Sequence, residues 1–318
     1  MKGSGDSLTA DGKGVRPPAI LGRPGHLVDA STGDGVRLHG FLQRPDDRGS
    51  EAWLWIIVPG VAGNFYSSTL LTAISDAVLD AGHGSLRVNT SGRDQIAFAS
   101  RGGFPAVAGS AFEKMADAVE DLRGWCRCAA DIGYQRVGLI GHSLGAIKIL
   151  KYLWADDAAA TSIGSAVLLS PPRLNHELLR NDPRHGANFV RDYDAARTAL
   201  QSGEPERLLR IRFPQPLYIS AGTFIDKYGP QDEHDYMVRC QDMSLTTAWI
   251  FGEQEVRGQR ANFADCDRML LGKLNPRTNQ IIVVPGADHN YADARATLRE
   301  ELGRIFDRAL IPPRPPLG

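Results

Sequence analysis

Six short runs of apolar residues, separated by segments with helical periodicity, constrain the fold of this chain most strongly. The runs show little apolar–polar alternation, which is typical of strands that are buried on both faces. They lie at residues 53–60, 85–92, 136–141, 165–172, 246–252 and 281–286. Helical patterns lie between or after them, among others at Phe112–Trp125, Ala146–Trp154 and Tyr291–Ala309. Strands that alternate with helices in this way predict an α/β fold, with a mostly parallel central sheet flanked by helices.

The alternation begins with a hairpin and is interrupted once. Residues 26–45 predict two short strands around an Asp34-Gly35 turn. Between the fourth and fifth runs lie 74 residues, 171–244, with helical patterns at Tyr193–Ser202 and Thr223–Tyr228. Because this connection is far longer than a usual loop, we interpret it as a helical cap insertion. The predicted organisation begins with a flexible lead-in at residues 1–25 and ends with a proline-rich tail at 311–318. Between them lie a core in two segments, 26–170 and 245–310, and the cap at 171–244.

Composition and charge exclude several classes of protein. Hydrophobic residues make up 42% of the chain and charged residues 23%, and 36 basic residues balance 37 acidic ones. The hydrophobic content argues against disorder. The near-zero net charge provides no electrostatic field that would attract nucleic acid or an anionic membrane. No apolar run approaches the roughly 18 residues that span a membrane, and the N-terminal segment lacks the apolar stretch of a secretory signal. We therefore expect a cytoplasmic protein without nucleic-acid or membrane partners, whose four cysteines are free thiols. The sequence leaves the oligomeric state open.

The pentapeptide Gly141-His142-Ser143-Leu144-Gly145 lies between an expected strand and an expected helix. A serine at such a sharp turn adopts strained backbone geometry, and glycine two places to either side leaves room for the turn. The Ser143 hydroxyl then lies at the positive end of the helix dipole, and the Leu144 N–H is free to bind a developing oxyanion. The pattern therefore predicts a nucleophilic serine. A glycine-rich turn of another α/β fold is the alternative.

With this motif in this order of elements, the chain resembles the α/β-hydrolase superfamily from about residue 26 to 309. The stretches PGVAGNFY, GHSLGAIK and SAGTFIDKYGP are also similar to a group of bacterial hydrolases and to fungal siderophore esterases. The resemblance implies an α/β-hydrolase fold with an inserted cap, and a serine hydrolase. The sequence shows no dinucleotide-binding glycine motif after a strand, no P-loop and no zinc-binding spacing of Cys and His, so no cofactor or metal is expected.

A serine nucleophile needs a general base that a carboxylate orients. The chain has eight histidines. His289, in PGADHNY after the last strand, resembles the catalytic histidine of the family. The other seven, His142 among them, are interpreted as surface or capping residues.

The acid is expected after the strand that ends in FGEQE, since the family order is serine, acid, histidine. The family usually shows Gly-x-x-Asp there, and counting from Gly252 puts Glu255 at the acid position. The longer glutamate departs from that pattern, so Glu253 remains an alternative. Asp226 is less suitable because Ser220 before it is typical of a helix N-cap, and Asp288 is expected to hydrogen-bond within its own loop.

The second oxyanion donor is expected from the loop that follows the first long strand. The family often has His-Gly there, whereas this chain has Pro59-Gly60. The residue after that glycine, Val61, is the expected donor beside Leu144. Asn64 and Phe65 could line the pocket or serve the turn, and no substrate-binding residue is assigned.

The cap carries an unusual number of arginines. Residues 173–212 contain eight arginines, no lysine and six acids. Solvated helix faces with local ion pairs are the first interpretation, and an anion-binding lid is the alternative. The acidic run at 232–235 is interpreted as a surface turn rather than a metal site, because consecutive residues do not readily converge on one ion.

These observations predict hydrolysis of a small-molecule carboxylic ester or lactone through Ser143, His289 and Glu255. The alternatives are a thioesterase or amidase, a carbon–carbon bond hydrolase on the same fold, and a non-catalytic small-molecule receptor.

Overall fold

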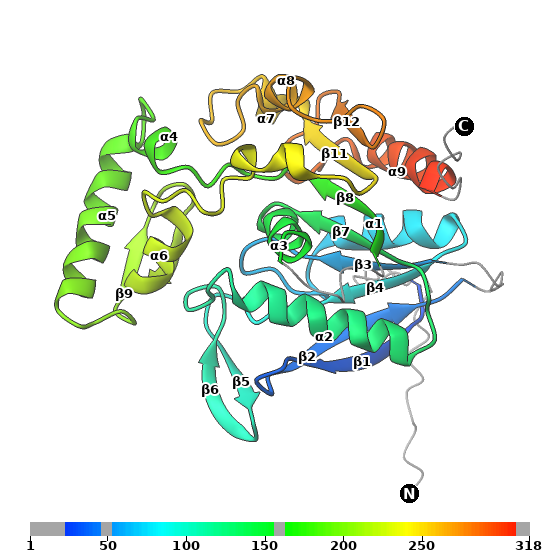
Figure 1. Ribbon diagram of the computed structural model, residues 1–318, viewed down its shortest axis with the longest axis horizontal. Coiled ribbons are helices and arrows are strands. Elements are labelled where there is room, and N and C mark those ends of the chain that lie inside the picture. Colours follow the sequence, from blue (N-terminus) through cyan, green and yellow to red (C-terminus); the bar gives the residue numbers. More distant parts are fainter. Residues whose placement is uncertain (1–22, 46–52, 156–162, 310–318) are drawn as a thin grey trace, which may run out of the picture.

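The structure is a computed structural model that describes residues 23–45, 53–155 and 163–309 (Figure 1). The proline-rich tail expected at 311–318 and most of the expected lead-in lie outside these ranges. The N-terminal and C-terminal ends of the described chain lie on the same side of the molecule as the core and away from the cap (Figure 1).

An eight-stranded sheet forms the centre of the molecule, in the order β1-β2-β4-β3-β7-β8-β11-β12. The first two pairings in this order are antiparallel and all others are parallel. The expected hairpin is present as β1 and β2, and Gly35 in its turn has a φ of 82°. The strands are β1 (His26–Ser31), β2 (Arg37–Gln43), β3 (Leu54–Val58), β4 (Gly84–Val88), β7 (Val137–His142), β8 (Ile163–Leu169), β11 (Thr247–Gly252) and β12 (Asn279–Val284).

Helices cover both faces of this sheet. On one face α1 (Thr69–Asp80) packs against α9 (Arg295–Ala309), and on the other α2 (Asp117–Asp131) packs against α3 (Leu144–Leu153). Successive side chains of β3 alternate between the two cores: Trp55 and Ile57 pack with α1 and α9, whereas Leu54 and Ile56 pack with α2 and α3. This two-sided burial explains why the strand sequences show no apolar–polar alternation.

The chain between β8 and β11 forms the part that extends to the left in Figure 1. It was expected to be helical, but it also contains a two-stranded antiparallel ribbon. The two strands are only four residues each, too short for their pattern to be distinct from the surrounding loops. The elements are α4 (His176–Arg180), α5 (Gly186–Gln201), β9 (Leu208–Ile211), β10 (Leu217–Ser220), α6 (Ala221–Tyr228) and two short 3-10 helices, η2 (Tyr236–Val238) and η3 (Cys240–Asp242).

Helix α6 is joined to the core by buried polar contacts. The Lys227 ammonium on α6 lies 3.2 Å from the Glu113 carboxylate, whose other oxygen lies 2.5 Å from Lys148 on α3. All three side chains are at most 1% exposed. In addition, the Asp226 carboxylate accepts a hydrogen bond of 2.9 Å from the Met115 N–H. The cap is therefore attached to the segment before α2 by charge as well as by apolar packing.

Two details near α2 differ from the sequence-based expectation. Helix α2 was expected from Phe112 but begins at Asp117. Residues 111–115 instead form hydrogen bonds with the cap: the Ala111 carbonyl, for example, accepts from the Ser220 N–H. The exposed hairpin of β5 (Ala97–Arg101) and β6 (Phe104–Ala108) was not anticipated. Within the described ranges, no helix combines the length and apolar composition needed to cross a membrane.

Candidate active site

Ser143 lies at the sharp turn between β7 and α3. Its φ and ψ are 56° and −125°, a strained conformation for a residue with a side chain. The Ser143 N–H donates to the Leu169 carbonyl at 2.8 Å, which ties the turn to the end of the adjacent strand β8. A Cβ on Gly145 would lie 2.4 Å from the Val58 carbonyl, so this position has no room for a side chain. The local fold thus holds the serine hydroxyl at the carboxyl edge of the sheet.

Ser143, His289 and Glu255 form a continuous hydrogen-bonded chain. The His289 Nε2 atom lies 3.1 Å from the Ser143 Oγ atom. On the other side of the ring, Nδ1 lies 2.6 Å from the Glu255 Oε1 atom. Because an ionised carboxylate only accepts hydrogen bonds, Nδ1 carries the proton and Nε2 is left to accept from the serine. The three residues follow β7, β11 and β12, so the parallel sheet brings their positions together.

The Glu255 carboxylate is buried and held by further donors. Its Oε2 atom accepts from the Ser170 hydroxyl at 2.5 Å and from the Gly252 N–H at 2.9 Å. The Tyr291 hydroxyl lies 2.8 Å from the Ser170 oxygen. Ser170 directly follows β8 and Tyr291 follows His289, and neither was singled out from the sequence. Their position beside the acid depends on the order of strands in the sheet, which one sequence does not specify.

The alternative acids lie in other arrangements. Glu253 accepts from the Gly286 N–H at 2.8 Å and is exposed. Asp226 is hydrogen-bonded to Met115, and Ser220 caps α6 as expected, accepting from the Thr223 N–H at 3.1 Å. Asp288 accepts from the N–H groups of its own loop. Of the four carboxylates considered, only Glu255 is within hydrogen-bonding distance of His289.

The two expected oxyanion donors line the same cavity as Ser143. In the described turns and loops, neither the Val61 nor the Leu144 N–H donates to another backbone group. A Cβ on Gly60 would lie 3.1 Å from the Ser143 Cβ, so glycine allows the Val61 loop to approach the serine closely. Asn64 accepts hydrogen bonds from the Tyr66 and Ser67 N–H groups and therefore serves the turn. The two amides are available to a substrate oxygen.

His142 is a component that the sequence interpretation missed. It was expected at the surface, but it is 9% exposed and its ring centre lies 4.8 Å from that of His289. Its Nε2 atom lies 2.8 Å from the His289 carbonyl oxygen and must donate, since that oxygen can only accept. Burial, together with the neighbouring His289, lowers the pKa of His142 to about 4. At neutral pH an uncharged His142 therefore holds the backbone of His289.

A small cavity of about 70 Å³ lies over the serine. It is small beside the several hundred Å³ of sites that bind drug-sized ligands. Core loops form one part of its wall and the cap forms the other. The lining residues are Val61, Ser143, Leu144, Pro172, Leu174, Pro214, Gln215, Tyr228, Arg260, Asn262, Phe263 and His289.

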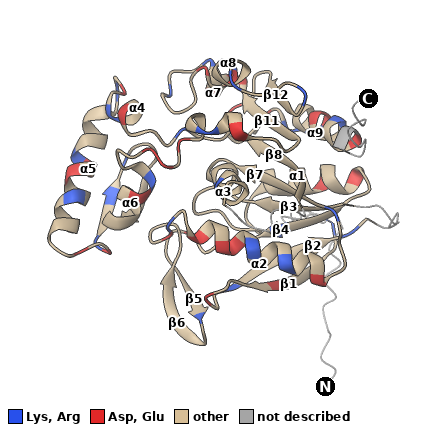
Figure 2. Ribbon diagram, in the orientation of Figure 1, with Lys and Arg blue, Asp and Glu red and all other residues tan. Residues whose placement is uncertain are grey.

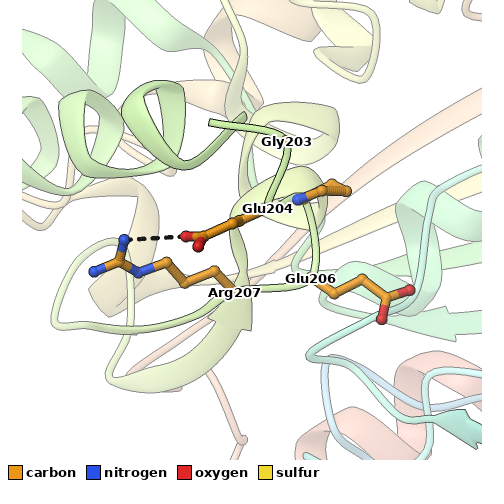
Figure 3. A pocket seen from close by; sticks show the side chains of 5 residues that line it. Gly203, Glu204, Glu206 and Arg207 are labelled. Carbon is orange, nitrogen blue, oxygen red and sulfur yellow. Dashed lines mark hydrogen bonds and ion pairs between the residues drawn. The ribbon is translucent and has the colours of Figure 1, made fainter. Parts of the chain in front are cut away.

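A larger hollow lies elsewhere and carries no such chemistry. It measures about 830 Å³ and is lined by five consecutive residues, 203–207, in the turn between α5 and β9 (Figure 3). Glu204 and Arg207 form an ion pair with each other at 3.2 Å across this turn. A hollow bounded by a single exposed turn does not enclose a ligand, so we do not consider it a functional site.

The acidic run at 232–235 is occupied by contacts within the protein. Asp232 accepts from the His176 N–H at 2.6 Å, and Asp235 forms an ion pair with Arg173 at 2.6 Å. Among the residues that the structure describes, no group of three or more His, Cys, Asp or Glu side chains could hold a metal ion. The four cysteines are free thiols.

Comparison with known proteins places the chain among hydrolases. Residues 36–311 match the profile of a family described as the alpha/beta hydrolase family. No curated protein matches the sequence significantly.

Solved structures with the same architecture come from several organisms. Est1E from Butyrivibrio proteoclasticus, with bound ferulic acid, is 14% identical with a TM-score of 0.63, over 89% of this chain and 99% of that one. A soluble variant of monoglyceride lipase from Saccharomyces cerevisiae, in complex with a substrate analogue, is 13% identical with a TM-score of 0.66, over 93% and 99%. The esterase domain of a Rhodothermus marinus protein is 16% identical with a TM-score of 0.57, over 90% and 99%. At these identities the likeness establishes the fold, and the fold predicted from the sequence is confirmed.

Proposed function

Because the chain belongs to the alpha/beta hydrolase family, we propose that it is a serine hydrolase that cleaves a carboxylic ester or lactone of a small molecule. The observation that carries the proposal is the hydrogen-bonded chain from Glu255 through His289 to Ser143, with distances of 2.6 Å and 3.1 Å. An alcohol is a poor nucleophile near neutral pH, and a general base that a carboxylate orients activates it by accepting its proton.

In the proposed reaction the Ser143 Oγ atom attacks the ester carbonyl and its proton passes to His289 Nε2. The carbonyl electrons move to oxygen, which the Val61 and Leu144 N–H groups bind. The oxyanion then collapses, the carbon–oxygen bond to the alcohol breaks, and the Nε2 proton leaves with the alkoxide. Water repeats the sequence on the acyl-serine, releasing the acid and restoring Ser143.

Glu255 and His142 act on His289 from two sides. The carboxylate orients the ring and stabilises the imidazolium while Nε2 holds the proton. The neutral His142 donates to the His289 carbonyl and adds no positive charge beside the imidazolium. Its role is positional, since it contacts the base and none of the reacting atoms.

The size of the cavity supports a short acyl or alcohol group next to the scissile bond. A volume of about 70 Å³ around Ser143 has room for a few heavy atoms. Thioesters and amides of the same size remain alternatives, because the same groups serve those reactions. Cleavage of a carbon–carbon bond would need further acid–base groups at the serine. Apart from His289, the described residues that line the cavity include no histidine and no carboxylate.

The test combines covalent labelling with turnover. A fluorophosphonate should phosphonylate the wild-type protein once, as read by intact mass, and p-nitrophenyl acetate should be hydrolysed faster than the octanoate. The Ser143→Ala variant should lose both the adduct and the turnover. A folded wild-type protein without an adduct would refute the nucleophile assignment and favour a non-catalytic receptor.

The two adjacent glutamates provide a matched pair for the acid. Glu255→Gln removes the charge that holds His289, and in serine hydrolases the comparable change lowers kcat by about 10⁴. Glu253→Gln removes the same charge from an exposed side chain that bonds the Gly286 N–H. We expect the first variant to lose most activity and the second to retain it, and the reverse result would reassign the acid.

A further inference from the structure

A second cavity adjoins the one over Ser143. It measures about 390 Å³ and shares three lining residues, Pro214, Arg260 and Asn262, with the smaller cavity. The proposed reaction makes no use of it. A substrate that is bound at Ser143 and is too large for the small cavity would extend in this direction.

Three arginines from three separate segments line the second cavity. Arg184 lies between α4 and α5, Arg212 follows β9, and Arg260 lies in the loop after α7 (Glu253–Val256). Among the described residues, Arg212 and Arg260 have no carboxylate within ion-pair distance, and Arg184 donates to the amide oxygen of Gln259. All three residues are exposed, so water screens the repulsion between their like charges, and an anion bound among them would lower that repulsion further.

Most other arginines of the cap are neutralised locally, which sets these apart. Five of the eight arginines between 173 and 212 form ion pairs, and α5 carries charges of both signs along its length (Figure 2). The five are Arg173, Arg180, Arg191, Arg197 and Arg207. The interpretation of solvated faces with local pairs therefore holds for four of the five, whereas Arg173 pairs with the buried Asp235, 62 residues away. Arg184, Arg210 and Arg212 have no ion pair among the described residues, and of these three Arg184 and Arg212 line the second cavity.

The one carboxylate in the lining of the second cavity is engaged elsewhere. The Oδ1 atom of Asp182 accepts the N–H groups of Arg184 and His185, at 3.0 Å and 2.8 Å, at the start of α5. The arginines and this aspartate leave a formal charge of +2. The remaining wall is partly apolar, since the buried Phe213 ring stacks on His185 with a centroid distance of 5.3 Å.

We propose that this cavity binds a carboxylate or phosphate group carried by the substrate of the Ser143 site. The inference rests on the proposed hydrolase function. The planar guanidinium fork matches the oxygens of both anions, and Arg260 lies at the junction between the scissile bond and the anion. The substrate class is then a small ester or lactone whose body is apolar and whose far end is an oxyanion.

The kinetic test uses two sets of substrates, each with charged and neutral members. Acetate release from 4-acetoxybenzoate and 4-acetoxyphenyl phosphate is compared with release from neutral 4-acetoxybenzamide, and mono-4-nitrophenyl succinate is compared with 4-nitrophenyl butyrate. The first set places the anion on the alcohol side, with one carboxylate and one phosphate arm, and the second places it on the acyl side. The measured quantity is the ratio of kcat/KM between the charged and neutral members, because intrinsic reactivity cancels when this ratio is compared between variants.

We expect the ratio in at least one set to fall by roughly three- to tenfold in Arg212→Gln and in Arg260→Gln, and further in the double variant. Arg210→Gln is the matched control, since it removes the same charge from the exposed strand β9 outside the cavity. The wild-type ratio should also fall with added salt. Equal ratios in wild type and the double variant for both sets would overturn the proposal.

A binding measurement separates this proposal from the hydrolase function. In the Ser143→Ala protein, benzoate and phenyl phosphate are titrated by calorimetry, without any turnover. Binding that weakens about tenfold in the Arg212→Gln, Arg260→Gln background supports the anion site even if no ester is cleaved. Binding that is absent, or unchanged by the double substitution, refutes the anion site. Fluorophosphonate labelling of Ser143 reports separately on the hydrolase function.

Discussion

Replacement of Glu113 by glutamine tests how strongly the cap is attached to the core. Glu113 lies between β6 and α2 and contacts Lys148 of α3 at 2.5 Å and Lys227 of α6 at 3.2 Å. Burial opposes ionisation of this carboxyl group, yet the two ammonium groups hold its pKa below the usual value. Glutamine keeps the shape of the side chain and removes its charge. Both lysines would then remain in the interior, with no carboxylate of the described residues within ion-pair distance.

The expected loss of stability follows from this burial. Removing one partner of a buried ion pair costs about 3–5 kcal/mol, because the remaining charge stays desolvated. The free energy of unfolding of a typical domain is only about 5–15 kcal/mol. We therefore expect Glu113→Gln to remove a large fraction of it. Burial already lowers the pKa of Lys227, so part of the cost can be relieved if this lysine releases its proton.

The assay is urea unfolding at pH 7, followed by the fluorescence of the five tryptophans. Glu204→Gln is the control, since it breaks an exposed ion pair with Arg207 at 3.2 Å and should cost less than about 1 kcal/mol. Adding Lys227→Met to Glu113→Gln should recover part of the loss. A Glu113→Gln protein as stable as the control would refute the argument that this cluster attaches the cap.

Three further outcomes follow from contacts described above and from the neighbourhood of Glu113. His142→Phe keeps an aromatic ring but removes the hydrogen bond that the His289 carbonyl accepts from His142. The kcat for p-nitrophenyl acetate should therefore fall roughly tenfold. An unchanged kcat would contradict a positional role for His142. Burial raises the pKa of Asp121 to about 7 in the folded protein, so the wild type should lose stability relative to Asp121→Asn as pH rises from about 4 to 7. A difference in unfolding free energy that does not change with pH, as measured by urea titration, would contradict this. A Cβ on Gly92 would lie 2.2 Å from the Glu113 carboxylate, whereas one on Gly303 meets nothing within 4 Å. Gly92→Ala should therefore lower the melting temperature and Gly303→Ala should not.

The strands of the core were predictable because five of the six apolar runs are buried on both faces and the sixth, the edge strand β12, is partly buried on both. All six apolar runs correspond to strands, since β3 and its parallel neighbours need apolar residues for two cores at once. Helix starts were less predictable. The last helix was expected from Tyr291 but begins at Arg295, because Tyr291 has a φ of 53° and places its hydroxyl beside Ser170. A tertiary contact there overrides local helical periodicity.

The site was predictable to the extent that it follows the chain order. Ser143, Glu255 and His289 each lie within five residues of the end of a strand, and a parallel sheet collects such positions at one edge. Ser170 and His142 were missed because their roles depend on which strands are neighbours and on which way a buried ring points. The anion cavity depends on the meeting of Arg260 with Arg184 and Arg212, which lie about 50 to 75 residues away along the sequence.

The position of the cap in the sheet has a consequence for how such a protein can evolve. Strands β8 and β11 are direct neighbours, with Ala166 opposite Thr247, so the whole cap takes the place of a single crossover connection. Its length and sequence can differ between related proteins without a change in the register of any strand of the sheet. Arg184 and Arg212 belong to this segment, whereas Arg260 and the proposed triad of Ser143, His289 and Glu255 belong to the core. If the proposed function holds, selection can therefore change the recognition of substrate groups far from Ser143 without changing the proposed chemistry at Ser143.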